Sequence, residues 1–140
     1  MNKSAARILV VDDDSRLLGL LTDTLETIGY TAEDASSAKE ALAKLAESKF
    51  HLIISDIKMP EMDGLSLLSR IRENYPGLPV IFITGQPQTD ILRSANPEGI
   101  LSKPFRISNL EDLIEQALEL KKTDDSELNR ISEISGELLS

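Results

Sequence analysis

Three short apolar runs rich in β-branched residues constrain the fold of this chain more than any other feature. They are Ile8–Val11, Leu52–Ile54 and Val80–Ile83. Each run is too short for an independent helix, and the runs are mostly unbroken by polar residues. Runs of this kind suit strands that are covered on both faces, as in a parallel sheet. The sequence therefore predicts a buried sheet built around these three strands.

The residues between these runs predict helices that alternate with the strands. Two further strands are weaker: Thr31–Ala35, which is more polar and therefore suits an edge, and Gly99–Ser102. Strand and helix alternate five times, which implies parallel strands joined by right-handed crossovers, with helices on both faces. We therefore expect an α/β fold with a doubly wound, five-stranded parallel sheet.

Caps and breakers set the expected helix boundaries. The clearest helix ends at Gly29 and carries an apolar stripe at helical spacing, namely Leu17, Leu18, Leu21, Leu25 and Ile28. Two others begin with a capping box, in which a serine and a glutamate bond to free backbone N–H groups. Gly64 should start a helix because glycine tolerates unusual backbone angles. The remaining helices are predicted from Ser37 to about Glu47, from about Gly64 to Tyr75, as a short or irregular turn near Thr89 to Ala95, and from Ser108–Glu111 onward.

Composition limits the classes of function. The 140 residues include 15 Lys plus Arg, 24 Asp plus Glu and no cysteine, which gives a formal net charge of −9. Phosphate backbones and acidic lipids attract Lys and Arg, so this charge argues against a nucleic-acid partner or a membrane surface. No disulfide or thiolate metal site can form. No apolar run nears the roughly 20 residues of a membrane span, and we expect a soluble, cytoplasmic protein.

Length and polarity predict one domain followed by a tail. One core suffices for a chain of this size, and we assign residues 1–122 to it. Residues 123–140 are more polar but carry apolar residues at spacings of three and four, namely Leu128, Ile131, Ile134 and Leu138. Either this stripe docks on its own domain or on a second copy, forming a homodimer, or it is a frayed end that Gly136 interrupts.

Polar residues stand at the ends of four of the five predicted strands. Asp12–Asp14 follow the first strand, Asp56 the third, Thr84 and Gly85 the fourth, and Lys103 the fifth. Ligands of open parallel sheets bind beyond the carboxyl ends of the strands, so these residues should share one edge. Crowded carboxylates repel unless protons or a cation neutralise them, and hard oxygen ligands suit Mg²⁺. The pattern predicts a magnesium site at this edge.

The same set of residues suits phosphoryl transfer. A carboxylate can act as the nucleophile and form an acyl phosphate. The remaining requirement is cancellation of charge on the equatorial oxygens, which Mg²⁺, Lys103 and the Thr84 hydroxyl could supply, while Gly85 leaves the approach open.

These residues resemble the receiver domain of two-component response regulators. The resemblance rests on Asp12 and Asp13, on Asp56–Pro60 with Asp63 and Gly64, on Thr84 and Gly85, and on Lys103–Phe105. It covers about residues 7 to 120. It implies the flavodoxin-like strand order 2-1-3-4-5, which is taken from the family and does not follow from this sequence.

The resemblance implies a role for each matching residue. Asp56 would accept the phosphoryl group of a phosphohistidine on a sensor histidine kinase or a histidine phosphotransfer protein. Asp13, Asp56 and the backbone carbonyl of Lys58 would bind Mg²⁺ directly, and Asp12 would act more through water. Lys103 would pair with the phosphoryl group. The domain would be a signalling switch and not an enzyme, limited to its own phosphorylation and slow autodephosphorylation.

The resemblance also implies a conformational response, with one departure from the family. Thr84 would move toward the phosphoryl group, and the Lys103–Pro104 peptide would be cis. Relatives usually carry an aromatic residue or histidine at the switch position that Ile100 occupies here, and only 18 residues separate Thr84 from Lys103. We therefore expect a population shift without an aromatic reporter, read by a downstream protein target. No output module follows, so we expect either a stand-alone receiver or the first part of a longer regulator.

A second family fits part of the pattern. Residues 10–15 resemble the start of haloacid-dehalogenase-type phosphatases, in which Asp12 would be the nucleophile and Asp14 the general acid. That family needs a further acidic pair after the lysine, and the next acids here, Glu111 and Asp112, fall in a predicted helix. For Asp14 alone, a helix cap is the favoured interpretation. Phosphorylation of Asp56 supports the receiver, and phosphorylation of Asp12 supports the phosphatase.

Overall fold

Five parallel strands form the centre of the molecule in a computed structural model that describes residues 3–85 and 94–119. In chain order the strands are β1 (Arg7–Val11), β2 (Thr31–Ala35), β3 (Leu52–Asp56), β4 (Val80–Thr84) and β5 (Gly99–Ser102). Their order in the sheet is β2-β1-β3-β4-β5. The expected doubly wound sheet and its strand order are confirmed, and Thr31–Ala35 is an edge strand, as its polarity indicated.

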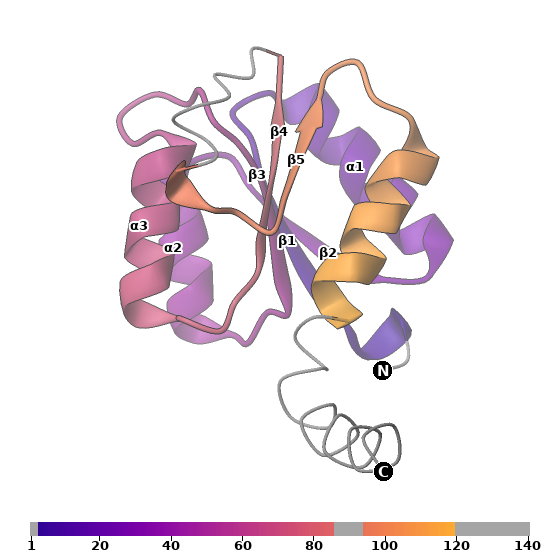
Figure 1. The fold of residues 1–140 in the computed structure, drawn as a ribbon, viewed down its shortest axis with the longest axis horizontal. Helices are drawn as coiled ribbons and strands as arrows, with labels where there is room; N and C mark the ends of the chain where they lie inside the picture. The colour runs from indigo at the N-terminus through magenta and orange to yellow at the C-terminus, as the bar shows by residue number, and fades with distance from the viewer. Residues whose placement is uncertain (1–2, 86–93, 120–140) are drawn as a thin grey trace, which may run out of the picture.

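Helices cover both faces of this sheet (Figure 1). On one face lie α2 (Ala38–Glu47) and α3 (Gly64–Asn74), and on the other lie α1 (Ser15–Ile28) and a helix over residues 107–119. A short 3-10 helix, η1 (Lys3–Ala5), precedes β1. Within the described residues, no helix combines the length and the apolar character that a membrane span requires.

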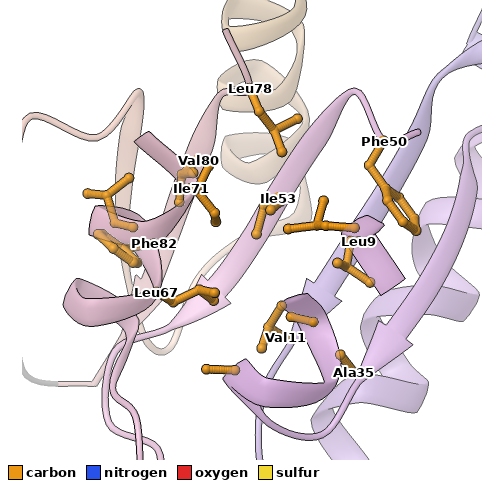
Figure 2. Close-up of a cluster of buried hydrophobic side chains, with 14 of the residues drawn as sticks. Leu9, Val11, Ala35, Phe50, Ile53, Leu67, Ile71, Leu78, Val80 and Phe82 are labelled. Atoms are coloured by element: carbon orange, nitrogen blue, oxygen red, sulfur yellow. The ribbon is translucent and has the colours of Figure 1, made fainter. Parts of the chain in front are cut away.

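Two apolar clusters, one on each face, hold the helices to the sheet. Figure 2 shows part of the cluster under α2 and α3, which includes Leu9, Ile53 and Phe82 of the sheet and Leu67 and Ile71 of α3. The other cluster packs α1 and the last helix against the opposite side chains of the same strands. Because β1, β3 and β4 are buried on both faces, their registers are strongly specified. The ends of these strands are therefore fixed relative to one another.

Most of the predicted caps are present. Gly29 ends α1 with φ of 123° and donates its N–H to the carbonyls of Leu25 and Glu26. Ser37 caps α2 by accepting the N–H of Glu40 at 3.1 Å. The Glu40 carboxylate returns to the N–H of Ser36, one residue before the cap, and not to Ser37 itself.

The predicted N-cap of the last helix, Ser108, is wrong by two residues. The helix begins at residue 107, and the carbonyl of Arg106 accepts the N–H groups of Asn109 and Leu110. Ser108 therefore lies inside the first turn and is not its cap. In any helix the carbonyl of the N-cap residue accepts the first backbone bond, and here that residue is Arg106, so the Ser108–Glu111 pattern misplaced the boundary.

Two predictions fall largely outside the described residues. The predicted turn near Thr89 to Ala95 lies outside them except for residues 94 and 95, which are helical. Residues 120–140, which contain the predicted tail helix, also lie outside them.

Gly64 is required by close packing and not, as we expected, by an unusual backbone angle. It opens α3 behind the Asp63 cap, and its N–H donates to the carbonyl of Ile57 at 2.8 Å. Its φ is not positive, whereas a Cβ placed on it would lie 2.9 Å from the Cα of Ile57 and would also clash with the Asp56 carbonyl oxygen. The start of α3 thus lies directly against the peptide of Asp56.

We predict that Gly64→Ala lowers the free energy of unfolding by about 1–3 kcal/mol, the usual cost of forcing an extra carbon into a packed site. Urea unfolding measures this change. Gly19→Ala is the matched control, because Gly19 lies within α1 and a Cβ there would meet nothing within 4 Å. The control should gain roughly 0.5–1 kcal/mol from helix propensity. Equal effects of the two substitutions would contradict the packing role of Gly64.

Candidate functional site

Three carboxylates converge at the carboxyl edge of the sheet. Asp12 and Asp13 follow β1, and Asp56 ends β3, the strand that pairs with β1. Carboxylate oxygens of the three residues lie within 4.8 Å of one another. Asp12 is buried, Asp56 is half-buried and Asp13 is exposed, so the cluster is partly accessible to solvent.

The sheet fixes Asp12 at the bottom of this cluster. Its N–H donates to the carbonyl of Ala35 at 3.1 Å, and its Oδ1 accepts the N–H of Asp14 at 2.9 Å. Burial raises the pKa of the Asp12 carboxyl above its ordinary value, and the charge of Asp56 adds to this effect. The N–H of Asp14 and the ammonium of Lys103 act in the opposite direction without cancelling the rise.

Lys103, which follows the edge strand β5, brings a positive charge to the carboxylates. Its Nζ lies 3.5 Å from Oδ2 of Asp12 and 3.6 Å from Oδ2 of Asp56. Its backbone N–H donates to the carbonyl of Thr84 at 2.8 Å, which continues the pairing of β4 with β5. The Lys103–Pro104 peptide is cis, as expected.

The Asp56 carboxylate is oriented by its own backbone neighbours. Oδ1 accepts the N–H of Ile57 at 2.8 Å, while Oδ2 faces Lys103. The hydroxyl of the buried Ser55 donates to the Asp56 carbonyl at 2.8 Å. The predictions did not include Ser55, although a hydroxyl next to the acceptor within an apolar strand is a signal that could have identified it.

The remaining predicted residues lie at or near the same edge. Thr84 is buried at the end of β4, and Gly85 follows it with open space around the position of a side chain. Lys58 is exposed in the loop after Asp56. Ile100 pairs with Phe82 across β4 and β5, is half-buried and packs against the apolar cluster of α2 and α3. The structure thus places Ile100 beside the core and three residues before Lys103.

The donor set fits a hard divalent cation. Three carboxylates and one ammonium leave an excess of negative charge in a partly buried site, which is unfavourable unless protons or a cation compensate it. All the side-chain donors of the cluster are carboxylate oxygens, the ligands that Mg²⁺ prefers. The residues present therefore match the predicted magnesium site.

Asp14 does not take part in this cluster. Its carboxylate accepts the N–H groups of Arg16 and Leu17 and caps α1. The cap interpretation is confirmed. The acid role that a phosphatase would need from Asp14 is not favoured by this geometry.

The structure defines a doubly wound α/β domain with a cluster of three carboxylates at one edge of its sheet, and comparison with known proteins assigns it to a family. Residues 8–115 match the model of the response regulator receiver domain. The chain therefore belongs to the response regulator receiver family, the signalling domains of two-component systems that in general act as phosphoacceptors.

Particular relatives differ in length. The chain is 42% identical over 113 residues to the response regulator protein FleR of Pseudomonas aeruginosa, covering 79% of this chain but only 24% of FleR. It is 38% identical to the receiver protein CpdR of Brucella abortus, covering 80% of this chain and 96% of CpdR. The crystal structure of TrrA from Thermotoga maritima, in complex with Mg²⁺ and BeF, matches with a TM-score of 0.75 and 30% identity, covering 81% of this chain and 99% of TrrA.

We predict that Asp12→Asn stabilises the metal-free protein at neutral pH. The pKa of Asp12 is raised in the folded state above its ordinary value of 3.8. The folded state therefore holds this proton more tightly than the unfolded state, and the associated stability is lost as the pH rises through the folded pKa. Urea unfolding in EDTA should show that the free energy of unfolding of the variant increases relative to that of the wild type as the pH rises above 3.8.

Asp23→Asn serves as the control for this pH series, because Asp23 is an exposed carboxylate on α1. The difference in free energy of unfolding between Asp23→Asn and the wild type should not increase with pH in the same way. An Asp12→Asn protein that is less stable than the wild type at pH 7 would show that burial does not dominate at this carboxyl.

Proposed function

We propose that this chain is a phosphorylation-switched receiver in which Asp56 takes a phosphoryl group from a partner histidine kinase or phosphotransfer protein. The observation that carries the proposal is the convergence of Asp12, Asp13, Asp56 and Lys103 at one edge of the sheet. This edge is where open parallel sheets bind their ligands. Each charged group there has a use in phosphoryl transfer.

The reaction follows from the positions of the charges. The Asp56 carboxylate attacks the phosphorus, the bond from phosphorus to the donor nitrogen breaks, and the imidazole leaves with the electron pair and takes up a proton. Mg²⁺, held by Asp12, Asp13, Asp56 and the Lys58 carbonyl, would supply charge neutralisation for the carboxylates and one phosphoryl oxygen. The Lys103 ammonium, already 3.6 Å from Asp56, is placed to pair with a second oxygen.

Water reverses the switch at the same site. It attacks the phosphorus of the aspartyl phosphate, the bond to the Asp56 oxygen breaks, the carboxylate is regenerated, and inorganic phosphate is released. Catalysis of this kind rests on positioning and electrostatics, so it requires no further nucleophile.

Phosphorylation changes the partners of Lys103 and Thr84, which gives the switch its readout. Before phosphorylation Lys103 pairs with the carboxylates of Asp12 and Asp56. A phosphoryl group on Asp56 offers it a dianionic partner and offers the Thr84 hydroxyl an acceptor. Both residues are joined through the pairing of β4 with β5, so their movement biases the position of β5 and of Ile100 within it. A downstream protein then binds one of the two arrangements.

The relatives support this reading. TrrA, at 30% identity, is described in a complex with Mg²⁺ and BeF, which supports magnesium as the cation here. CpdR is itself named a response regulator receiver protein and is matched over 96% of its length, which supports a receiver role for this chain. The match covers only 24% of FleR, so we infer nothing for this chain from the rest of that protein.

Incubation with Mg²⁺ and acetyl phosphate, followed by intact mass, tests the acceptor. The wild type should gain the mass of one phosphoryl group, Asp56→Asn should gain none, and EDTA should abolish the gain in the wild type. Asp14→Asn is the matched control, because asparagine also caps helices and Asp14 lies outside the cluster. The control should react like the wild type.

Two results would overturn this proposal. A full mass gain in Asp56→Asn would move the acceptor elsewhere, and its loss in Asp12→Asn and Asp14→Asn alone would favour the phosphatase arrangement. No gain in the wild type with Mg²⁺ present would remove the phosphoacceptor role.

A further inference from the structure

A network of hydrogen bonds around Glu98 ties the start of β5 to α3 and β4. The Glu98 carboxylate receives the Arg72 guanidinium in a bidentate pair, with Nη1 3.0 Å from Oε1 and Nη2 3.1 Å from Oε2. Oε2 also accepts the backbone N–H of Val80 at 2.6 Å. Arg72 Nη2 donates in addition to the carbonyl of Asn96 at 3.0 Å. One carboxylate thus joins a helix, a strand and the segment that leads into the next strand.

The contacts of this network are stronger than those of an ordinary surface ion pair. The pair is bidentate, and its side chains are only 32% exposed for Arg72 and 23% for Glu98. Val80 is buried, and its N–H stands at the first residue of β4, so loss of Oε2 would leave a buried donor without this partner. The Glu98 N–H returns to the Val80 carbonyl at 2.9 Å, so backbone and side chain fix the same residue.

β5 needs an anchor of this kind. It has four residues and lies at the edge of the sheet, where β4 is its only partner strand among the described residues. The bonds of Glu98 to Val80 stand before its first residue, and the bond from Lys103 N–H to the Thr84 carbonyl stands after its last. A slip of one residue would move Lys103 by about 3.3 Å and turn its side chain to the other face of the sheet.

We propose that Glu98 and Arg72 are positioning residues for the phosphoacceptor site. They act through β5, whose register determines whether the Lys103 ammonium reaches Asp12 and Asp56. They also tie β5 to α3, the helix whose first residue, Gly64, lies against the Asp56 peptide. The expected effect on phosphorylation rests on the proposed function, whereas the role of the two residues in holding the register of β5 does not.

The test separates the cation from the phosphoryl group. The carboxylates come from β1 and β3, whereas Lys103 comes from β5. In Arg72→Met and in Glu98→Gln, calorimetry with Mg²⁺ should therefore give a dissociation constant within about twofold of the wild type. The rate of phosphorylation by acetyl phosphate at saturating Mg²⁺ should fall by about tenfold, within the range that a misplacement of roughly 1 Å produces.

Two further variants control the experiment. Arg70→Met removes an exposed arginine from the same helix and should leave the rate unchanged. Arg72→Lys keeps the charge but not the bidentate geometry, so it should restore the rate only in part. A rate that stays at the wild-type value in both Arg72→Met and Glu98→Gln overturns the proposal, as does a parallel loss of Mg²⁺ affinity.

Hydrogen exchange gives a readout that needs no phosphorylation. The Lys103 amide, which bonds to Thr84, should exchange about tenfold faster in Arg72→Met, whereas the amides of β1 and β3 should not change. Unchanged exchange at Lys103 overturns the proposal. If the wild type takes up no phosphoryl group, the proposed function fails, and this exchange experiment alone then decides the role of the Glu98 network.

Discussion

The mutual repulsion of three carboxylates held at one edge of a sheet is the constraint on which the rest of this structure depends. β1 and β3 hold carboxylate oxygens of Asp12, Asp13 and Asp56 within 4.8 Å of one another. Burial also raises the pKa of the Asp12 carboxyl. One ammonium, Lys103, offsets part of the charge. A site in this condition favours added positive charge, and our account of the chain as a cation-assisted phosphoacceptor follows from that imbalance.

The apolar core stabilises the strands that hold the carboxylates and so offsets their repulsion. β1, β3 and β4 are buried on both faces, and apolar clusters lock their registers from either side. β5, like β2, lies at an edge of the sheet, and it has only four residues. The charge that balances the carboxylates therefore comes from the end of a short edge strand. This difference between the strands fits the switch that we propose, in which β5 responds to Asp56 while the strands that carry the carboxylates stay in place.

The sequence contained much of the fold and of the site because the signals involved are local. Apolar runs located the strands, and the residues just after Val11, Ser55 and Ile83 identified the edge. The strand order came from the family resemblance. Features that depend on distant neighbours were missed or misread. Gly64 packs against the Asp56 peptide, and Glu98 pairs with Arg72, which is 26 residues away in the sequence. No local pattern reports such partners.

Chemical mapping of the phosphorylated residue tests the central claim most directly. Borohydride reduces an aspartyl phosphate to homoserine, so treatment of the wild-type protein after reaction with acetyl phosphate and Mg²⁺, followed by peptide mass analysis, reads the acceptor without any substitution. Our account predicts homoserine at position 56 alone. Homoserine at position 12, or at no position in a protein that binds Mg²⁺, would contradict it.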